Sequence, residues 1–283
     1  MQIDHSLANL ILARWTEPSR TGPLIVTVFG DAIAPRGGEM ALSALIDLLA
    51  ELGIGPGVVR TAISRLAADF WLEGSKEGRL SFYRLTEKSR LEFAAAEPRI
   101  YGPLDRPWDG KLRLAFPPQG ADRSSLEAAG FAVLAPGVLA APDGSPEALH
   151  LLATGEPEAL RVLAARAWPL ERLGVLYRAF IDRFTVLEHG AADLPPKEAM
   201  PARALLIHDY RRIVLRDPRL PAALLPHPWP GHTARELCIR IYDALAPASE
   251  HWLDAVRNKS GPLQRGPDPR SRFYPSPSGR GQG

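Results

Sequence analysis

The spacing of hydrophobic residues along residues 55–85 changes from a helical repeat to a strand-like pattern. Apolar residues recur every three or four positions from Val59 to Phe70, which predicts a helix with one apolar face. A strand then begins at Trp71, a charged turn covers residues 76–79, and a second strand covers residues 80–85. The segment is therefore predicted to be a helix followed by a two-stranded ribbon.

The polar side of this predicted helix carries side chains that suit DNA. Arg60 and Ser64 are four residues apart, as are Thr61 and Arg65, so all four project from one face. A helix of this kind beside a basic ribbon indicates a winged helix-turn-helix. The alternatives are a solvated helix face, an internal ion pair for Arg60, and an Arg65–Asp69 pair. The predicted DNA-contacting residues are Arg60, Thr61, Ser64 and Arg65 on the helix and Lys76 and Arg79 at the ribbon tip.

The residues before and after this segment extend the unit. Residues 24–30 are apolar and β-branched, but the preceding Pro23 and the following Gly30-Asp31 favour a helix that ends there. A glycine pair at 37–38 breaks the chain, and residues 40–52 predict a second helix. After the ribbon, a fourth helix is predicted from Thr86 to residue 96, stopped by Pro98.

The middle of the chain alternates between strand and helix patterns after a linker at residues 101–107. Strands are predicted at 111–116, 131–134, 138–141 and 149–153, and helices at 124–130 and 157–167. The order βαββα(β) predicts a ferredoxin-like domain, of a kind that often serves dimerisation or ligand sensing.

The C-terminal part is predicted to be helical at 173–184, 200–216, 233–245 and 248–256. Ten of the last 26 residues are Gly or Pro without a repeat, which predicts disorder. The predicted class is α+β, with an N-terminal arm (1–20), a winged-helix domain (21–100), a ferredoxin-like domain (108–170), a helical C-terminal domain (171–257) and a disordered basic tail (258–283).

Composition and charge agree with a DNA-binding protein in a reducing compartment. Cys238 is the one cysteine among 283 residues, so no internal disulfide can form and the cytoplasm is expected. No apolar run is long enough to cross a bilayer, and residues 1–15 do not resemble a signal peptide. The net charge is only +2, but residues 60–90 hold seven basic residues against four acidic ones. Positive charge is thus concentrated around the predicted DNA-reading unit.

The sequence gives little support for an enzyme. A ferredoxin-like nuclease needs an acid at the end of its first strand, but Asp109 precedes that strand. Cys238 has apolar neighbours, and His227 and His232 lack further ligands for zinc. We expect no catalytic residues, metal or cofactor.

Several motifs resemble the PaaX family of transcriptional repressors. The strings LIVTVFGDAIAPRGG, VRTAISRL and GRLSFYRLTEKSR carry the resemblance at the N-terminus, and HDYRRIVLRDPRLPAALLPHPWPGH carries it near the C-terminus. It implies a cytoplasmic homodimer that binds double-stranded operator DNA and is released by an aryl-acetyl-CoA thioester, typically phenylacetyl-CoA, bound in the C-terminal part. Two features depart from the family: the basic tail, and Phe70-Trp71 where Gly-Trp is expected. The second predicts a helix that runs directly into the wing.

An acyl-CoA site requires cations for the phosphates and an apolar pocket for the acyl group. The residues of that type are Arg211, Arg212 and Arg216 with Tyr177, Phe180 or Trp229. These arginines could equally form a solvated face, and the aromatic residues could belong to the core. A regulator that senses a different small molecule, or a DNA-binding or protein-interaction module without a sensor, remains the alternative function.

Overall fold

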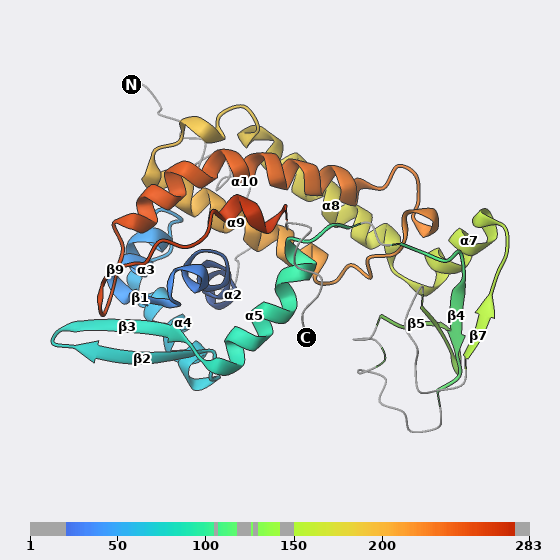
Figure 1. Cartoon of the computed structure of the whole chain (residues 1–283), viewed down its shortest axis with the longest axis horizontal. Helices are drawn as coiled ribbons and strands as arrows, with labels where there is room; N and C mark the ends of the chain where they lie inside the picture. Colours follow the sequence, from blue (N-terminus) through green and yellow to red (C-terminus); the bar gives the residue numbers. More distant parts are fainter. Residues whose placement is uncertain (1–20, 105–106, 118–125, 127–129, 142–149, 275–283) are drawn as a thin grey trace. The chain divides into compact units, whose positions relative to one another are not determined.

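The computed structural model describes residues 21–104, 107–117, 126, 130–141 and 150–274 (Figure 1). The chain forms two compact units. The described residues of the first are 21–102, 180–215 and 234–274, and those of the second lie within 103–179 and 216–233. Helices and small antiparallel sheets give the α+β class that the sequence predicts. The predicted arm, residues 1–20, lies outside the described residues.

The first unit is built around α2 (Thr21–Val28), which packs against α4 and α9 and is helical as predicted (Figure 1). The predicted end at Gly30-Asp31 is wrong, because the helix continues as η1 (Phe29–Ile33) and η2 (Ala34–Arg36). Gly30 lies inside the continued helix and is required there, because the Phe93 ring leaves no space for a Cβ atom. Asp31 also lies inside it, with its side chain buried.

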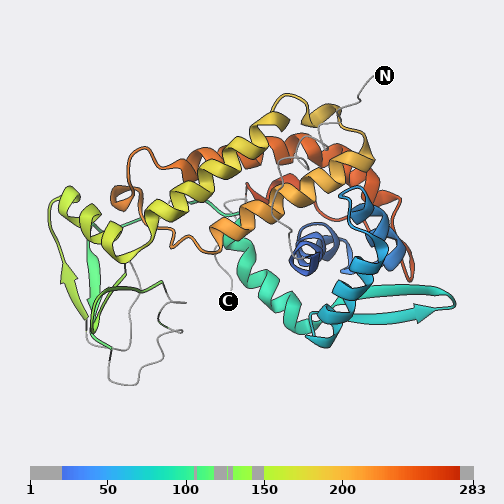
Figure 2. The same ribbon diagram turned by 180° about the vertical axis from the view of Figure 1, so that it is seen from behind.

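Two further helices and a sheet follow along the chain. The helices are α3 (Leu42–Ala50) and α4 (Pro56–Ala68), and the antiparallel sheet has the order β1-β3-β2 from β1 (Glu39–Ala41), β2 (Leu72–Glu77) and β3 (Leu80–Leu85). Strand β1 replaces the predicted first turn of the second helix, because Met40 and Ala41 pair with Tyr83 and Phe82. The β2–β3 ribbon projects away from the helices (Figures 1 and 2).

Helix α5 (Glu87–Ile100) passes through Pro98, where the sequence predicts its end. Helical hydrogen bonding continues past the proline, because the Tyr101 N–H donates to the Glu97 carbonyl at 2.9 Å. Ile100 and Tyr101 are 6% and 3% exposed, so burial of their side chains favours the extra turn. Tyr101 therefore belongs to the core and not to a linker.

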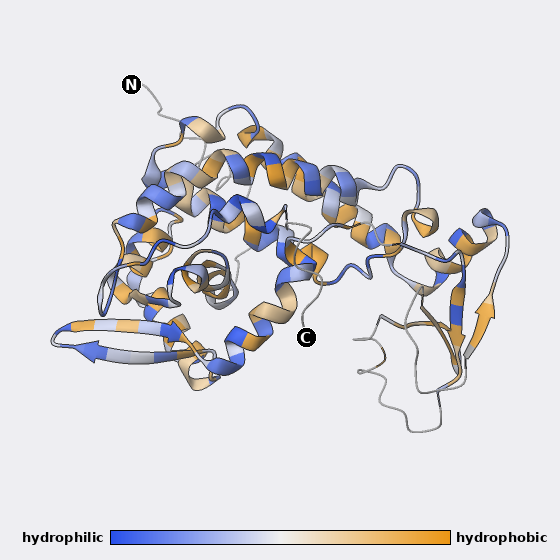
Figure 3. Cartoon of the chain, in the orientation of Figure 1, coloured by the Kyte–Doolittle hydropathy of each residue, from blue (hydrophilic) through white to orange (hydrophobic). Residues whose placement is uncertain are grey.

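The helices of the second half of the chain are longer than the sequence predicts. They are α8 (Leu170–Phe184), α9 (Pro196–Val214) and α10 (Pro230–Asp254), with short 3₁₀ turns η3 (Thr185–Leu187) and η4 (Ala191–Asp193) after α8. Helix α10 replaces two predicted helices and contains Pro247, and the Ser249 hydroxyl donates to the Ala246 carbonyl one turn earlier. Hydrophobic and hydrophilic positions alternate around α10 (Figure 3).

Residues 257–274 are ordered, contrary to the predicted disorder from residue 258. This segment, called the C-terminal strap below, contains β8 (Arg257–Asn258), β9 (Gly261–Pro262) and η6 (Pro269–Arg272). The strap is ordered because Leu263 and Phe273 are buried in the first unit, and Phe273 packs edge-on against Tyr101 and Tyr242. Their burial outweighs the glycine and proline content on which the prediction rested. Residues 275–283 lie outside the described part.

The second unit contains a four-stranded antiparallel sheet with the order β5-β6-β4-β7. Its strands are β4 (Leu112–Ala115), β5 (Ala132–Ala135), β6 (Val138–Ala141) and β7 (His150–Ala153), followed by α7 (Pro157–Ala167) and later η5 (Ala222–Leu224). The strands match the prediction, whereas the predicted helix at 124–130 lies outside the described residues except for two positions. Among the described helices, none could span a membrane.

Candidate nucleic-acid interface

Helix α4 is held by one buried face. Gly55 is its N-cap and Pro56 is its first residue, a position that tolerates proline because that N–H has no helical partner. Val59 and Ile63 are almost completely buried, and Ala62 and Leu66 are each 9% exposed. The buried face fixes the orientation of the opposite side, which carries the predicted DNA-contacting residues.

Arg60, Thr61, Ser64 and Arg65 are all exposed on that opposite side. The Thr61 hydroxyl donates to the Gly57 carbonyl at 2.9 Å, and the Ser64 hydroxyl donates to the Arg60 carbonyl at 3.0 Å. Both hydroxyl protons are thus donated to backbone carbonyls of α4 itself, as is common for Ser and Thr in helices. The groups left for a partner are the hydroxyl oxygens as acceptors and the Thr61 methyl group.

The two arginines of α4 have no ion pair within the described residues. In particular, the pair between Arg65 and Asp69 that i,i+4 spacing allows is not formed. An exposed guanidinium without an internal partner keeps all five N–H donors available, and its planar fork matches guanine and phosphate.

The ribbon presents its charges at the tip. Lys76 and Arg79 are exposed on either side of Gly78, whose φ of 58° permits a two-residue turn. Farther down the ribbon, Arg84 is paired with Glu73 at 2.8 Å. Lys76 and Arg79 at the tip have no ion pair within the described residues, whereas the charge of Arg84 is neutralised by Glu73.

The corner between α4 and β2 differs from the predicted direct run of helix into wing. Phe70 has a φ of 57°, in the left-handed region, although it is not glycine and its side chain is 73% exposed. Trp71 N–H donates to Leu66 O at 2.8 Å and Phe70 N–H to Ala67 O at 3.2 Å. These two bonds form a Schellman motif with phenylalanine in the position that usually holds glycine. The chain therefore turns sharply at Phe70, although the left-handed conformation is unfavourable for a residue with a Cβ atom.

The start of α5 holds this corner in place. The Thr86 hydroxyl donates to the Phe70 carbonyl at 2.8 Å, and the Ser89 hydroxyl donates to the Trp71 carbonyl at 2.5 Å. The Trp71 ring also meets Phe93 of α5 edge-on, with centroids 6.3 Å apart. Side chains of α5 thus fix the angle between α4 and the wing.

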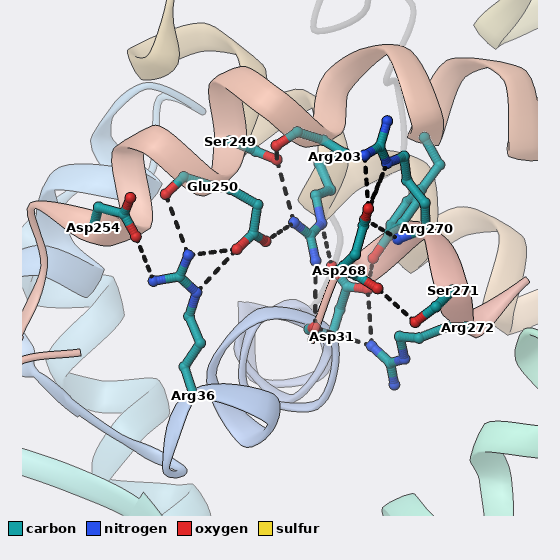
Figure 4. Close-up of polar contacts among 12 residues, drawn as sticks. Asp31, Arg36, Arg203, Ser249, Glu250, Asp254, Asp268, Arg270, Ser271 and Arg272 are labelled. Atoms are coloured by element: carbon teal, nitrogen blue, oxygen red, sulfur yellow. Dashed lines mark hydrogen bonds and ion pairs between the residues drawn. The ribbon is translucent and has the colours of Figure 1, made fainter. Parts of the chain in front are cut away.

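A buried charge cluster that the sequence prediction missed joins the N-terminal elements to α9, α10 and the strap (Figure 4). Asp31 accepts hydrogen bonds from Arg203 at 2.7 Å, Tyr101 at 2.6 Å, Tyr242 at 2.9 Å and Arg272 at 3.3 Å. Burial alone would raise the pKa of Asp31, but Arg203 and Arg272 outweigh it and lower the pKa. An acid in the apolar string LIVTVFGDAI was the sequence signal for a buried ion pair.

Arg36 extends the same cluster by binding Glu250 and Asp254 of α10 (Figure 4). Within the strap, the Arg272 guanidinium also stacks on the Tyr101 ring, 3.8 Å from its centroid. Elements from both ends of the chain are therefore fixed to one another by paired charges.

The predicted effector residues do not form one site within either unit. Arg211 and Arg212 belong to the first unit, whereas Arg216, Tyr177 and Trp229 belong to the second. Tyr177 is completely buried, donates to Asp217 at 2.6 Å and packs edge-on against Trp229. These two aromatic residues are thus core residues, which the sequence left open as the alternative. Phe180 is also buried, and so is Cys238, whose pKa is raised by burial.

Comparison with known proteins decides the family. Residues 20–89 match the profile of the PaaX-like protein family, and residues 168–255 match that of the PaaX-like protein C-terminal domain. The chain is 39% identical to the transcriptional repressor PaaX of Escherichia coli (strain K12), and the match covers 80% of each protein. The chain belongs to the PaaX family. Its members are transcriptional repressors and not enzymes.

The solved structures include an uncharacterized protein from Mycobacterium tuberculosis that is 26% identical to this PaaX-family chain. The match has a TM-score of 0.49 and covers 74% of this chain and 90% of that protein. The profile matches end at residues 89 and 255, so the C-terminal strap, which begins at residue 257, lies outside them.

Proposed function

We propose that this protein is a repressor of aromatic, phenylacetate-type catabolic genes that binds double-stranded operator DNA as a homodimer in the cytoplasm. The observation that carries the proposal is the exposed face of α4, where Arg60 and Arg65 lack ion-pair partners within the described residues. In a family of repressors, unpaired arginines on an exposed helix beside a basic ribbon suit major-groove recognition.

In this proposal α2, α3 and α4 with the β1-β3-β2 sheet form a winged helix-turn-helix, and α4 is its recognition helix. Arg60 and Arg65 contact base edges, Thr61 and Ser64 contact thymine methyl groups or phosphate, and Lys76 and Arg79 hold the backbone. The β5-β6-β4-β7 order of the second unit fits a ferredoxin-like sheet, which would serve dimerisation or sensing.

The regulatory part of the proposal is release of the DNA by an aryl-acetyl-CoA thioester such as phenylacetyl-CoA. Family membership supports it, because repression of a catabolic pathway requires a signal that its substrate is present. Phenylacetyl-CoA must then lower operator affinity by favouring a conformation that binds DNA less well.

Fluorescence anisotropy with a labelled duplex, selected from random sequences by the protein itself, tests both parts. We expect tight binding to the selected duplex, weaker binding to a scrambled one, and a steep loss of affinity with salt. Addition of phenylacetyl-CoA, but not of coenzyme A alone, should then release the selected duplex. Failure to select any sequence would overturn the DNA-binding part, and unchanged affinity with the thioester would overturn the regulatory part.

A further inference from the structure

A pocket of about 310 Å³ lies in the first unit among α5, η1, η2 and the C-terminal strap. Its volume is at the lower end of the range for small-molecule sites, which suits a single ring with a short side chain rather than a whole coenzyme. The charged residues of its lining are three arginines and two acids, so the lining has a formal charge of +1. They are Arg90, Arg211 and Arg272 against Asp31 and Glu97.

Arg211 is the unusual member of this lining. Its Nε is buried and has no hydrogen-bond partner among the described residues, and burial lowers the pKa of the guanidinium. By contrast, the buried arginines Arg203 and Arg36 are each paired with two acids: Arg203 with Asp31 and Glu250, and Arg36 with Glu250 and Asp254. Arg211 is half-buried and has no ion pair within the described residues, and a desolvated cation without an acid is costly, so Arg211 is a group to which an anionic or polar ligand would bind.

Much of the remaining lining of the pocket is apolar and aromatic. Phe93 is half-buried there, and its ring lies so close to Gly30 that any larger residue at position 30 would displace it. Leu85, Ile100 and Ile207 are further apolar residues of the lining, and Tyr101, whose hydroxyl donates to Asp31, also belongs to it. An aromatic ring fits this apolar lining, while an oxygen attached to it through a short chain could accept from Arg211.

We propose that this pocket binds the aryl-acyl group of the effector, with the ring against Phe93 and the acyl oxygen bound by Arg211. The inference rests on the proposed function for the existence of an effector, but it places the site in the DNA-binding unit. Two kinds of ligand carry an aromatic ring with a carboxyl-type oxygen at the end of a short chain. One is a free aromatic acid, and the other is its CoA thioester.

The wall of the pocket is connected directly to the DNA-reading elements. Phe93 lines the pocket and also meets Trp71 edge-on at the corner that follows α4. Thr86, the N-cap of the same helix, and Ser89 donate to the backbone carbonyls of Phe70 and Trp71. A ligand that moves α5 therefore changes the angle between α4 and the wing, which is how binding here would release DNA.

Isothermal titration calorimetry with phenylacetate and with phenylacetyl-CoA tests the site on the full-length protein. Ala94→Trp adds a large side chain to the lining at an exposed position, and Ala95→Trp, at an exposed position outside the lining, is its matched control. Arg211→Met removes the cation, and Arg240→Met removes an exposed arginine outside the lining. Thermal unfolding and operator affinity without ligand are measured for every variant.

We expect at least one probe to bind the wild type, the Ala95→Trp variant and the Arg240→Met variant equally. Arg211→Met and Ala94→Trp should each weaken that binding about tenfold or more, since a charge-assisted hydrogen bond or the pocket volume is lost. Arg211→Met should unfold at the same or a higher temperature, which a purely structural role would not give.

Equal binding by wild type and Arg211→Met, or no binding of either probe to the wild type, overturns the site. If phenylacetyl-CoA still releases DNA from Ala94→Trp as from the wild type, the proposed function stands and this site is wrong. If no variant or wild type binds operator DNA, the proposed function fails, while the calorimetric comparison still decides the pocket.

Discussion

Replacing Phe70 with glycine should stabilise the protein, although it removes a large hydrophobic side chain. The left-handed φ of 57° costs a residue with a Cβ atom about 1–2 kcal/mol, and glycine adopts it freely. Glycine loses about 0.5–1 kcal/mol more in chain entropy on folding, which offsets part of the gain. The Phe70 side chain is 73% exposed, so little packing is lost with it. The net gain should be about 0.5–1 kcal/mol.

The control is Phe70→Ala, which removes the same side chain but keeps a Cβ atom and therefore the strain. Urea unfolding followed by circular dichroism should show a higher midpoint for Phe70→Gly, at an unchanged m-value, and no increase for Phe70→Ala. A Phe70→Gly protein that is no more stable than Phe70→Ala would refute the argument from backbone strain.

Two further predictions concern the strap and one buried histidine. Phe273→Ala should lower the free energy of unfolding by about 3–5 kcal/mol in urea titrations, because Phe273 packs edge-on against Tyr101 and Tyr242; a tail that does not pack would give no change. Burial, and then Arg211 and Arg212, lower the pKa of His208 to about 3. The unfolded chain therefore binds the extra proton below about pH 6.5, and stability should fall by about 2 kcal/mol between pH 7.5 and pH 5. His208→Gln should remove this part of the acid sensitivity, and an identical pH profile for this variant would contradict the assignment.

The sequence predicted those elements whose pattern is local. The apolar repeat from Val59 to Leu66 gave α4, and alternation with a glycine turn gave β2 and β3. The exposed positions of Arg60 and Arg65 follow from the same repeat. Local periodicity suffices wherever one face of an element is buried and the other is solvated.

The remaining features depend on contacts between residues far apart in the chain. Strand β1 exists because residues 39–41 pair with β3, about 43 positions later. The strap is ordered because Phe273 packs against Tyr101 and Arg272 donates to Asp31, and both partners lie more than 170 positions earlier in the chain. No local pattern encodes such pairs, and the sequence predicted for Asp31 only that a helix ends there.

The proposed role of α4 as the DNA-reading helix is tested most directly by the affinity of Arg60→Ala for the selected duplex. Arg60 is exposed and on the face opposite the buried residues of α4, so its removal should leave folding intact. Loss of one good base contact should weaken specific binding by about 1–3 kcal/mol, or roughly 5- to 150-fold, while binding to scrambled DNA changes less. Arg240→Ala, which removes an exposed arginine paired with Glu188, is the control and should bind as the wild type does. Equal affinity of Arg60→Ala and wild type for the selected duplex would contradict the assignment of α4 as the recognition helix.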